Sequence, residues 1–258
     1  ASRSSASAPA ATRASGASWR YVARANSALT QHDTRVARYV ELDYSENTRH
    51  KAAQIHAHAA LHNALGSYTM PSDADVQAER YALLGMDLRE LADATAKDAS
   101  ERLARALDPA RPTLLLCECV LAYVPPDDAD AVLRCILARV GSAALLAYDM
   151  IVAGDATTDE EPSRFGSVML QNLAARQLML PGARACASLG AYEARFARLL
   201  ARCDAHAVHA HACSLRSLWY ALERAERERL ARIEGLDEVE ELEMLLAHYC
   251  IVWAERSV

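Results

Sequence analysis

The sequence predicts an α/β protein built on a mainly parallel sheet. Short apolar segments of strand length alternate with helix-compatible stretches through the first 150 residues. Four of these segments are apolar along most of their length, as expected of strands that are buried on both faces. An acidic residue stands at or near the end of each of the four. Alternation and continuous apolarity together predict the fold class.

The predicted strands are separated by segments that favour helices. The strands are expected at 38–43 (RYVELD), 80–88 (RYALLGMDL), 113–121 (TLLLCECVL) and 143–150 (AALLAYDM). Residues 46–65 favour one helix, and residues 127–140 favour another whose apolar side chains fall on one stripe. Asp127 or Asp128 is expected to cap the start of the second helix.

After Met150 the sequence predicts mainly helices. Amphipathic helices are predicted over 163–180, 188–203 and 214–236, the last ending at Gly235, and residues 237–258 are expected to run from a helix into a final strand. Residues 205–213 alternate like a strand. Because no linker rich in Gly, Pro or Ser divides this part, we expect a single domain over 36–258 with a helical insertion at about 154–204.

The first 35 residues differ in composition from the rest. They are rich in Ala and Ser, and no acidic residue precedes Asp33. Such a segment is typical of a transit peptide or of a low-complexity tail, and the sequence leaves both interpretations open. It is expected to lie outside the folded domain.

Composition also limits the classes of partner that the protein is expected to bind. The 258 residues carry a net charge of -6 with acids and bases interspersed, which favours neither nucleic acid nor an anionic membrane as a partner. No run of 18 apolar residues is present, so no membrane span is expected. The seven cysteines are odd in number and mostly lie in apolar runs, which favours reduced thiols and a cytoplasmic location.

Carboxylates at strand ends are the first candidate for a site. Asp43, Asp87, Glu118 and Asp149 close or follow the four predicted strands. Ligands of open α/β sheets bind at the carboxyl ends of the strands, and acids there accept hydrogen bonds from ribose hydroxyls or purine amino groups. A single aspartate after a strand is also a common helix cap, so it is the recurrence at all four strands that favours a site.

Histidines form the competing candidate. His209, His211 and Cys213 would share one face of a strand, which is a possible zinc geometry. No second cluster with C-x-x-C spacing accompanies them, so exposed histidines are the preferred interpretation and no metal site is predicted. G-x-S-x-G, P-loop and H-E-x-x-H motifs are absent.

These segments together resemble a known family. VELDYSENTRHKA, YALLGMDLREL, PTLLLCECVLAYVPPDDADAVL, SRFGSVMLQNLAARQ and LDEVEELEMLLAHYC occur in the order found in leucine carboxyl methyltransferases. The resemblance covers roughly residues 36–256, and the E-C-V-L-x-Y and L-L-x-H-Y-C stretches are its most specific parts. It implies a Rossmann-like class I methyltransferase sheet with helical additions in the C-terminal half.

Site residues follow from the resemblance position by position. It implies that Asp43 binds the ribose of S-adenosylmethionine, that Asp87 and Leu88 border the adenine, and that Glu118 lies at the methionine end of the cofactor. It also implies catalytic roles for two further residues. Tyr123 would line the reaction site near the transferable methyl group, and Arg164 would help to enclose the substrate.

The implied reaction is methyl esterification of the C-terminal leucine of the protein phosphatase 2A catalytic subunit by a monomeric enzyme. Two alternatives stay open: a degenerate, non-catalytic protein that binds the phosphatase, and a relative that methylates another carboxylate such as a tRNA wybutosine precursor. The sequence departs from the family in lacking the glycine-rich turn and the basic R-G-Y segment expected near the N-terminus. Trp19 and Arg20 are the nearest remnant, and Arg20 is, with Arg164, a candidate for holding the substrate carboxylate.

Overall fold

The computed structural model describes residues 36–93, 95–155, 161–201 and 209–256, and these form two compact units. The first unit holds the described residues up to Glu90 together with Ala96–Ala106, and the second holds Leu91–Thr95 and the chain from Leu107 onward. The N-terminal segment with Trp19 and Arg20 lies outside the described residues. Each unit has its own sheet and is described separately.

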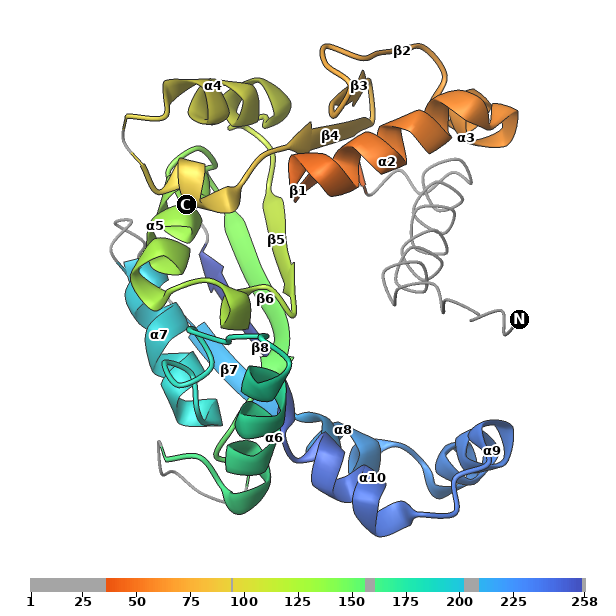
Figure 1. The fold of residues 1–258 in the computed structure, drawn as a ribbon, viewed down its shortest axis with the longest axis vertical. Helices are drawn as coiled ribbons and strands as arrows, with labels where there is room; N and C mark the ends of the chain where they lie inside the picture. The colour runs from red at the N-terminus through yellow and green to blue at the C-terminus, as the bar shows by residue number, and fades with distance from the viewer. Residues whose placement is uncertain (1–35, 94, 156–160, 202–208, 257–258) are drawn as a thin grey trace, which may run out of the picture. The chain divides into compact units, whose positions relative to one another are not determined.

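Figure 1 labels the elements of the first unit, whose centre is a four-stranded mixed sheet with strand order β1-β4-β3-β2. Its elements are β1 (Tyr39–Asp43), α2 (Ser45–Ala57), α3 (Ala59–Leu65), β2 (Tyr68–Thr69), β3 (Val76–Ala78), β4 (Tyr81–Gly85), the 3₁₀ turn η1 (Leu88–Leu91) and α4 (Lys97–Ala106). Strands β1 and β4 are parallel, as predicted, and Asp43 pairs with Gly85. Helix α2 packs on the sheet, with Ala52 and Ile55 against Val76, Tyr81 and Leu83.

The second unit contains a sheet with strand order β5-β6-β8-β7. Its elements are β5 (Thr113–Glu118), the 3₁₀ turn η2 (Leu121–Tyr123), α5 (Pro126–Leu137), β6 (Ala143–Met150), α6 (Arg164–Ala175), α7 (Leu189–Ala201), β7 (His209–Ser214), α8 (Leu215–Ala221), α9 (Arg224–Glu234), α10 (Val239–Leu246) and β8 (Tyr249–Arg256). Strands β5 and β6 are parallel, whereas β8 runs antiparallel to both of its neighbours, β6 and β7.

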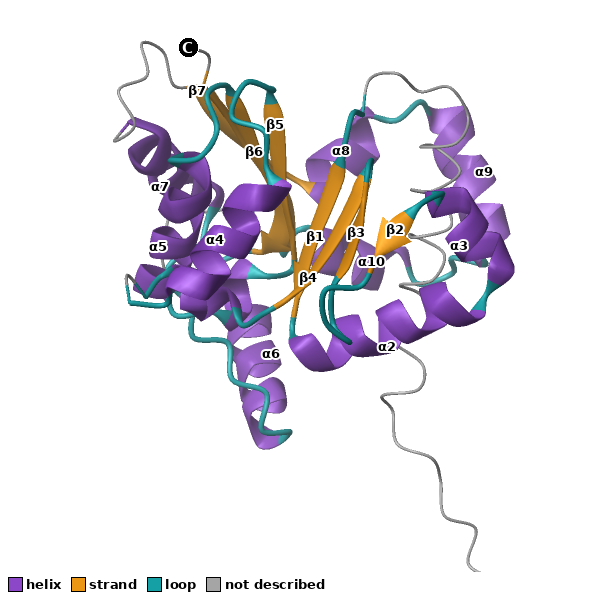
Figure 2. Ribbon diagram, turned by 90° about the horizontal axis from the view of Figure 1, so that it is seen from above, coloured by secondary structure: helices purple, strands orange, loops and turns teal. Residues whose placement is uncertain are grey.

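Helices α5 and α7 cover one face of this second sheet (Figure 2). Leu133 and Leu137 of α5 and Phe196 and Leu199 of α7 pack with residues such as Leu145 of β6 in one buried cluster. On the other face Leu114 and Leu116 of β5 are 62% and 54% exposed. The sheet is therefore buried more fully on one face than on the other.

Several predicted boundaries are wrong. The helix expected over 46–65 is two helices, α2 and α3, because His58 is extended. Three others also have a local reason. Strand β4 ends at Gly85, before the expected limit at residue 88, because Asp87 starts a turn by accepting a hydrogen bond from the Arg89 backbone N–H. Strand β5 ends at Glu118, before the expected limit at residue 121, because Cys119 has a positive φ of 51°. The helix expected over 214–236 is two helices, α8 and α9, because Leu222 and Glu223 are extended.

The expected aspartate cap is also wrong. Helix α5 begins with Pro125 at the N-cap and Pro126 in the first helical position, while Asp127 and Asp128 lie in the first turn. Proline suits this position because it lacks the N–H that would go unsatisfied there. The two carboxylates favour the helix through its dipole rather than through a capping hydrogen bond. The predicted stop at Gly235 is confirmed, with φ at 64°.

Candidate functional site

Asp43 closes β1 of the first unit and is held there by local hydrogen bonds. Its Oδ1 accepts from the backbone N–H of Tyr44 at 2.7 Å and from the side-chain amide of Asn47 at 3.1 Å. Both bonds use the same oxygen, so among the described residues Oδ2 keeps its lone pairs for another donor. A carboxylate in this position suits a ligand with hydroxyl groups.

A buried ion pair holds the neighbouring end of β4. Asp75 is 6% exposed; its Oδ1 accepts from the backbone N–H of Gly85 at 2.9 Å and from Nη2 of Arg102 at 2.6 Å. The same Arg102 nitrogen donates to the carbonyl oxygen of Gly85 at 2.9 Å. A Cβ at Gly85 would collide with Thr48 of α2, so only glycine allows this close approach. This clamp fixes the strand end from which Asp87 and Leu88 follow.

Asp87 is engaged by a neighbouring cation. Arg89 donates from Nε and from Nη2 to the Asp87 carboxylate at 3.0 and 2.5 Å. These hydrogen bonds lower the pKa of the Asp87 carboxyl. Leu88 is half-buried at the start of η1. A ligand amino group that approached Asp87 would therefore share the carboxylate with Arg89.

In the second unit Glu118 ends β5 with its side chain exposed. The chain then turns at Cys119, whose positive φ is unusual for a residue other than glycine. The Cys119 backbone N–H still donates to the carbonyl oxygen of Tyr148 at 2.7 Å, so the turn is anchored to β6. Burial raises the pKa of the Cys119 thiol to about 11, which keeps it protonated at neutral pH.

Tyr123 lies in the turn η2, which two contacts hold in place. Asp149 Oδ2 accepts from the backbone N–H of Ala122 at 3.2 Å. Gly182 donates its backbone N–H to the Ala122 carbonyl oxygen at 3.0 Å. Tyr123 as a residue is 54% exposed. The turn thus presents an accessible phenol on a supported backbone.

Asp149 does not share the arrangement of the other strand-end acids, which corrects the expectation of four equivalent carboxylates. Glu118 pairs in register with Tyr148, so Asp149, one residue later, points to the opposite face of the sheet. There it is fully buried, and burial raises the pKa of its carboxyl. Its oxygens accept from the backbone N–H groups of Ala122 and Met150. Asp149 is a structural anchor for the turn that carries Tyr123.

Arg164 is the first residue of α6 and is exposed. Helix α6 is tied to the start of β8 through Ser163, whose Oγ lies 2.7 Å from His248 Nε2 and accepts from the backbone N–H of Gly166. The ring centroids of Phe165 and His248 lie 4.5 Å apart. Since the start of β8 pairs with the end of β6, these contacts hold the start of α6 at the same end of the sheet as Glu118.

Two tyrosines that the sequence did not single out also lie at this end. Tyr148 of β6 and Tyr249 of β8 stack with ring centroids 5.6 Å apart and an interplanar angle of 21°. Both are half-buried. They are far apart in the chain, and only the antiparallel register of β6 and β8 brings them together. Short motifs in the sequence carry no signal for such a pair.

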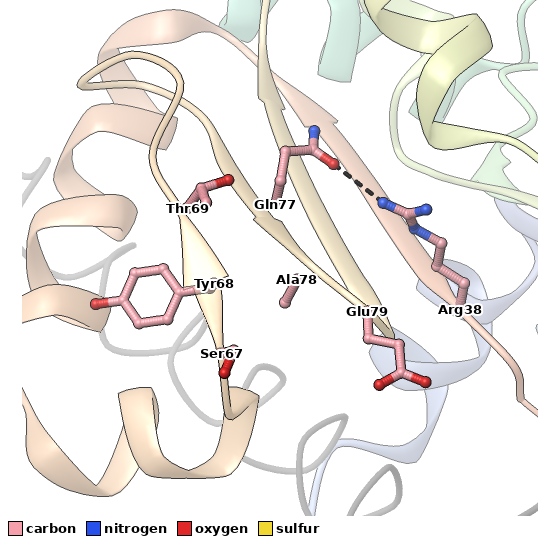
Figure 3. A pocket seen from close by; sticks show the side chains of 7 residues that line it. All are labelled: Arg38, Ser67, Tyr68, Thr69, Gln77, Ala78 and Glu79. Carbon is pink, nitrogen blue, oxygen red and sulfur yellow. Dashed lines mark hydrogen bonds between the residues drawn. The ribbon is translucent and has the colours of Figure 1, made fainter.

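A hollow of about 360 Å³ lies elsewhere in the first unit (Figure 3). It is lined by Arg38, Ser67, Tyr68, Thr69, Gln77, Ala78 and Glu79. Arg38 donates from Nη2 to Gln77 Oε1 at 3.0 Å. None of the predicted site residues lines this hollow, and the mixture of one arginine and one glutamate does not select a ligand charge.

Histidines do not assemble a metal site in the part of the chain that the structure describes. His211 of β7 packs against Trp253 of β8, with ring centroids 5.5 Å apart. Groups of three or more potential ligands that could hold a metal ion are absent among the described residues. Nor does any helix within those ranges have the length and apolarity to cross a membrane.

Comparison with known proteins gives one consistent result. The family model described as leucine carboxyl methyltransferase matches residues 27–137. Proteins named leucine carboxyl methyltransferase 1 are 35% identical in Mycosarcoma maydis, 31% in Bos taurus and 30% in Cryptococcus neoformans. The matches cover 88%, 89% and 93% of this chain and 57%, 65% and 67% of those proteins. The chain thus spans between a half and two thirds of the length of its relatives.

Likeness to solved structures is weaker. A protein of the duf574 family from Streptomyces avermitilis has a TM-score of 0.45 and 16% identity, over 94% of this chain and 83% of that chain. A likeness of this degree is too slight to assign a function.

Proposed function

Because the chain belongs to the leucine carboxyl methyltransferase family, we propose that it forms a methyl ester on the α-carboxylate of a C-terminal leucine, with S-adenosylmethionine as the methyl donor. The proposed substrate is the catalytic subunit of protein phosphatase 2A. Within each unit the proposal is supported by acids at or near the carboxyl ends of parallel strands: Asp43 ends β1, Asp87 follows β4, and Glu118 ends β5.

The donor set of the first unit fits the nucleoside half of this cofactor. Asp43 has an oxygen free of other described partners, and carboxylates at such strand ends accept from ribose hydroxyls. Asp87 is ionised, and its carboxylate and the neighbouring Leu88 suit an adenine amino group and an apolar ring edge. We propose Asp43, Asp87 and Leu88 as the residues that bind the nucleoside.

In the second unit Glu118 is proposed for the methionine end of the cofactor. When bound, S-adenosylmethionine would supply an electrophilic methyl group on a sulfonium centre. Glu118 is exposed at the end of β5, and an acid in this position suits a cationic amino group. Tyr123 is proposed to line the reaction site, where its accessible hydroxyl can orient a carboxylate oxygen.

The substrate itself explains why the chain needs no general base. A terminal carboxylate with a pKa of about 3.3–3.7 is already ionised at neutral pH. The residues around it must then hold one oxygen in line and exclude water, and orientation of this kind can lower a barrier by roughly 7–11 kcal/mol. We propose that Arg164, exposed at the start of α6, pairs with the incoming carboxylate.

Incubation with radiolabelled S-adenosylmethionine and the phosphatase catalytic subunit tests this function. The expected result is label that is released by mild base, which identifies an ester, and that is lost when the phosphatase lacks its terminal leucine. No ester on the wild-type phosphatase would refute the proposal. Label on a different carboxylate, such as that of a tRNA wybutosine precursor, would show that the chain methylates another substrate by the same class of reaction.

A second function, binding of the phosphatase without catalysis, is favoured by the surface of α8, α9 and α10. These helices and the turns beside them expose large apolar side chains, namely Leu218, Tyr220, Leu222, Ile233, Val239, Met244 and Leu245. Exposed apolar side chains concentrated on neighbouring helices are typical of protein-binding surfaces. Calorimetry distinguishes the two functions, because a non-catalytic binding protein is expected to bind the phosphatase without binding S-adenosylmethionine.

A further inference from the structure

Three aromatic and acidic side chains share one corner of the second sheet. Glu118 and Tyr148 are paired in register on β5 and β6, so their side chains project from the same face. Tyr249 of β8 stacks on Tyr148 at 5.6 Å between ring centroids. Because Asp149 and its buried partners occupy the opposite face, these three side chains are not part of the main core.

This corner remains open to solvent. Glu118 is exposed, and the two tyrosines are half-buried, so the stack leaves part of each ring accessible. The turn η2 ends nearby: Tyr123 acts electrostatically on the phenol of Tyr249 and raises its pKa. We refer to Glu118, Tyr123, Tyr148 and Tyr249 together as the aromatic corner.

The charged member of the aromatic corner is the carboxylate of Glu118. Burial raises the pKa of the phenols of Tyr148 and Tyr249 above the usual range. Cys119 and Asp149, when ionised, raise the pKa of both phenols further, and Glu118 does so for Tyr148. A negative carboxylate beside two π faces favours a cation without a hydration shell over an anion.

We propose that the aromatic corner binds the positively charged sulfonium centre of the methyl donor, with Tyr148 and Tyr249 as positioning residues that discriminate the charged donor from the neutral product. This inference rests on the proposed function. A sulfonium cannot accept hydrogen bonds and carries its charge on carbon-bound sulfur, so aromatic faces and a nearby carboxylate are the groups that stabilise it. The neutral thioether of S-adenosylhomocysteine would gain little from the same groups.

Calorimetric titration of the whole chain with S-adenosylmethionine and, separately, with S-adenosylhomocysteine tests the inference. Tyr148→Leu removes the ring and is expected to weaken binding of S-adenosylmethionine by roughly 2- to 30-fold, the range of a cation–π contact. Binding of S-adenosylhomocysteine is expected to change by less than about twofold, because the product carries no charge at the sulfur. Tyr148→Phe keeps the ring and is expected to keep the preference.

Trp253→Leu is the matched control. Trp253 lies on the same face of β8 as Tyr249 but pairs with Leu146, further from the end of β6 than Tyr148. Its replacement removes an aromatic ring from this face and leaves Glu118, Tyr123, Tyr148 and Tyr249 in place, so the preference for the charged donor is expected to persist. An equal loss of both ligands in Tyr148→Leu, or a selective loss in Trp253→Leu, would overturn the inference. Wild-type protein that binds neither ligand would instead overturn the proposed function, and the inference with it.

Discussion

Gly182 supports the turn that carries Tyr123, and replacing it by alanine should destabilise the second unit. A Cβ at this position would lie 2.8 Å from the carbonyl oxygen of Val124 and closer still to that of Leu121. Neither atom belongs to a flexible side chain, so the backbone itself must move. The shift would also stretch the hydrogen bond from the Gly182 N–H to the Ala122 carbonyl oxygen.

The magnitude follows from three contributions. Forcing a group into a packed site costs about 1–3 kcal/mol. Weakening one backbone hydrogen bond adds about 1 kcal/mol. Loss of glycine from the unfolded chain stabilises the folded state by about 0.4–1 kcal/mol. The free energy of unfolding of Gly182→Ala should therefore fall by about 1–3 kcal/mol.

Urea denaturation followed by tryptophan fluorescence is the appropriate assay, because Trp219 and Trp253 both belong to the second unit. At about 1–3 kcal/mol per molar urea, the midpoint should fall by roughly 1 M. Gly190→Ala is the control: this glycine lies in α7, and a Cβ added there would meet no atom within 4 Å, so alanine should raise the midpoint. A midpoint for Gly182→Ala at or above that of wild type would refute the reasoning.

Four further predictions concern the first unit, the Cys119 thiol and the cofactor. Asp75→Ala should destabilise the first unit by about 1–3 kcal/mol, measured by urea denaturation, because it leaves the buried backbone N–H of Gly85 without its acceptor and removes the nearer carboxylate from Arg102; an unchanged free energy of unfolding would contradict this. Alkylation of Cys119 in the native protein at pH 8 should be roughly a hundredfold slower than that of an ordinary thiol, since its pKa is raised to about 11. Because the unfolded thiol ionises near pH 9 while the folded one stays protonated, stability should fall between about pH 9 and 11; a rise would contradict the assignment. Asp43→Asn should weaken binding of S-adenosylmethionine by roughly tenfold in calorimetry, because an amide accepts hydrogen bonds less strongly than a carboxylate, and unchanged affinity would exclude Asp43 from the site.

Continuous apolar composition was enough to predict the parallel strands. Strands β1, β4, β5 and β6 all form within the predicted segments. The expectation that all four are buried on both faces is wrong: β4 is buried along its whole length, but β5 exposes Leu114 and Leu116. Their ends were harder to predict. Asp87 and Cys119 end β4 and β5 through a side-chain turn and a left-handed backbone, and neither is visible in an apolar pattern.

Contacts between residues far apart in the chain also could not be predicted from composition. Tyr148 and Tyr249 come together only through the antiparallel register of β6 and β8. The short strands β2 and β3, with only two and three residues, were also not predicted. Short strands bury too little apolar surface to leave a periodic signal in the sequence.

Glu118 and Asp149 have different roles because successive side chains of a strand point to opposite faces of the sheet. Both are acids near the ends of neighbouring parallel strands, and composition alone made them equivalent. Because Glu118 pairs with Tyr148, a shift of one residue turns Asp149 to the covered face. Burying the Asp149 carboxylate there would be costly without the hydrogen bonds that it accepts from the backbone N–H groups of Ala122 and Met150. Asp149 therefore has a structural role. Glu118, on the open face beside the stacked tyrosines, keeps its carboxylate for a ligand.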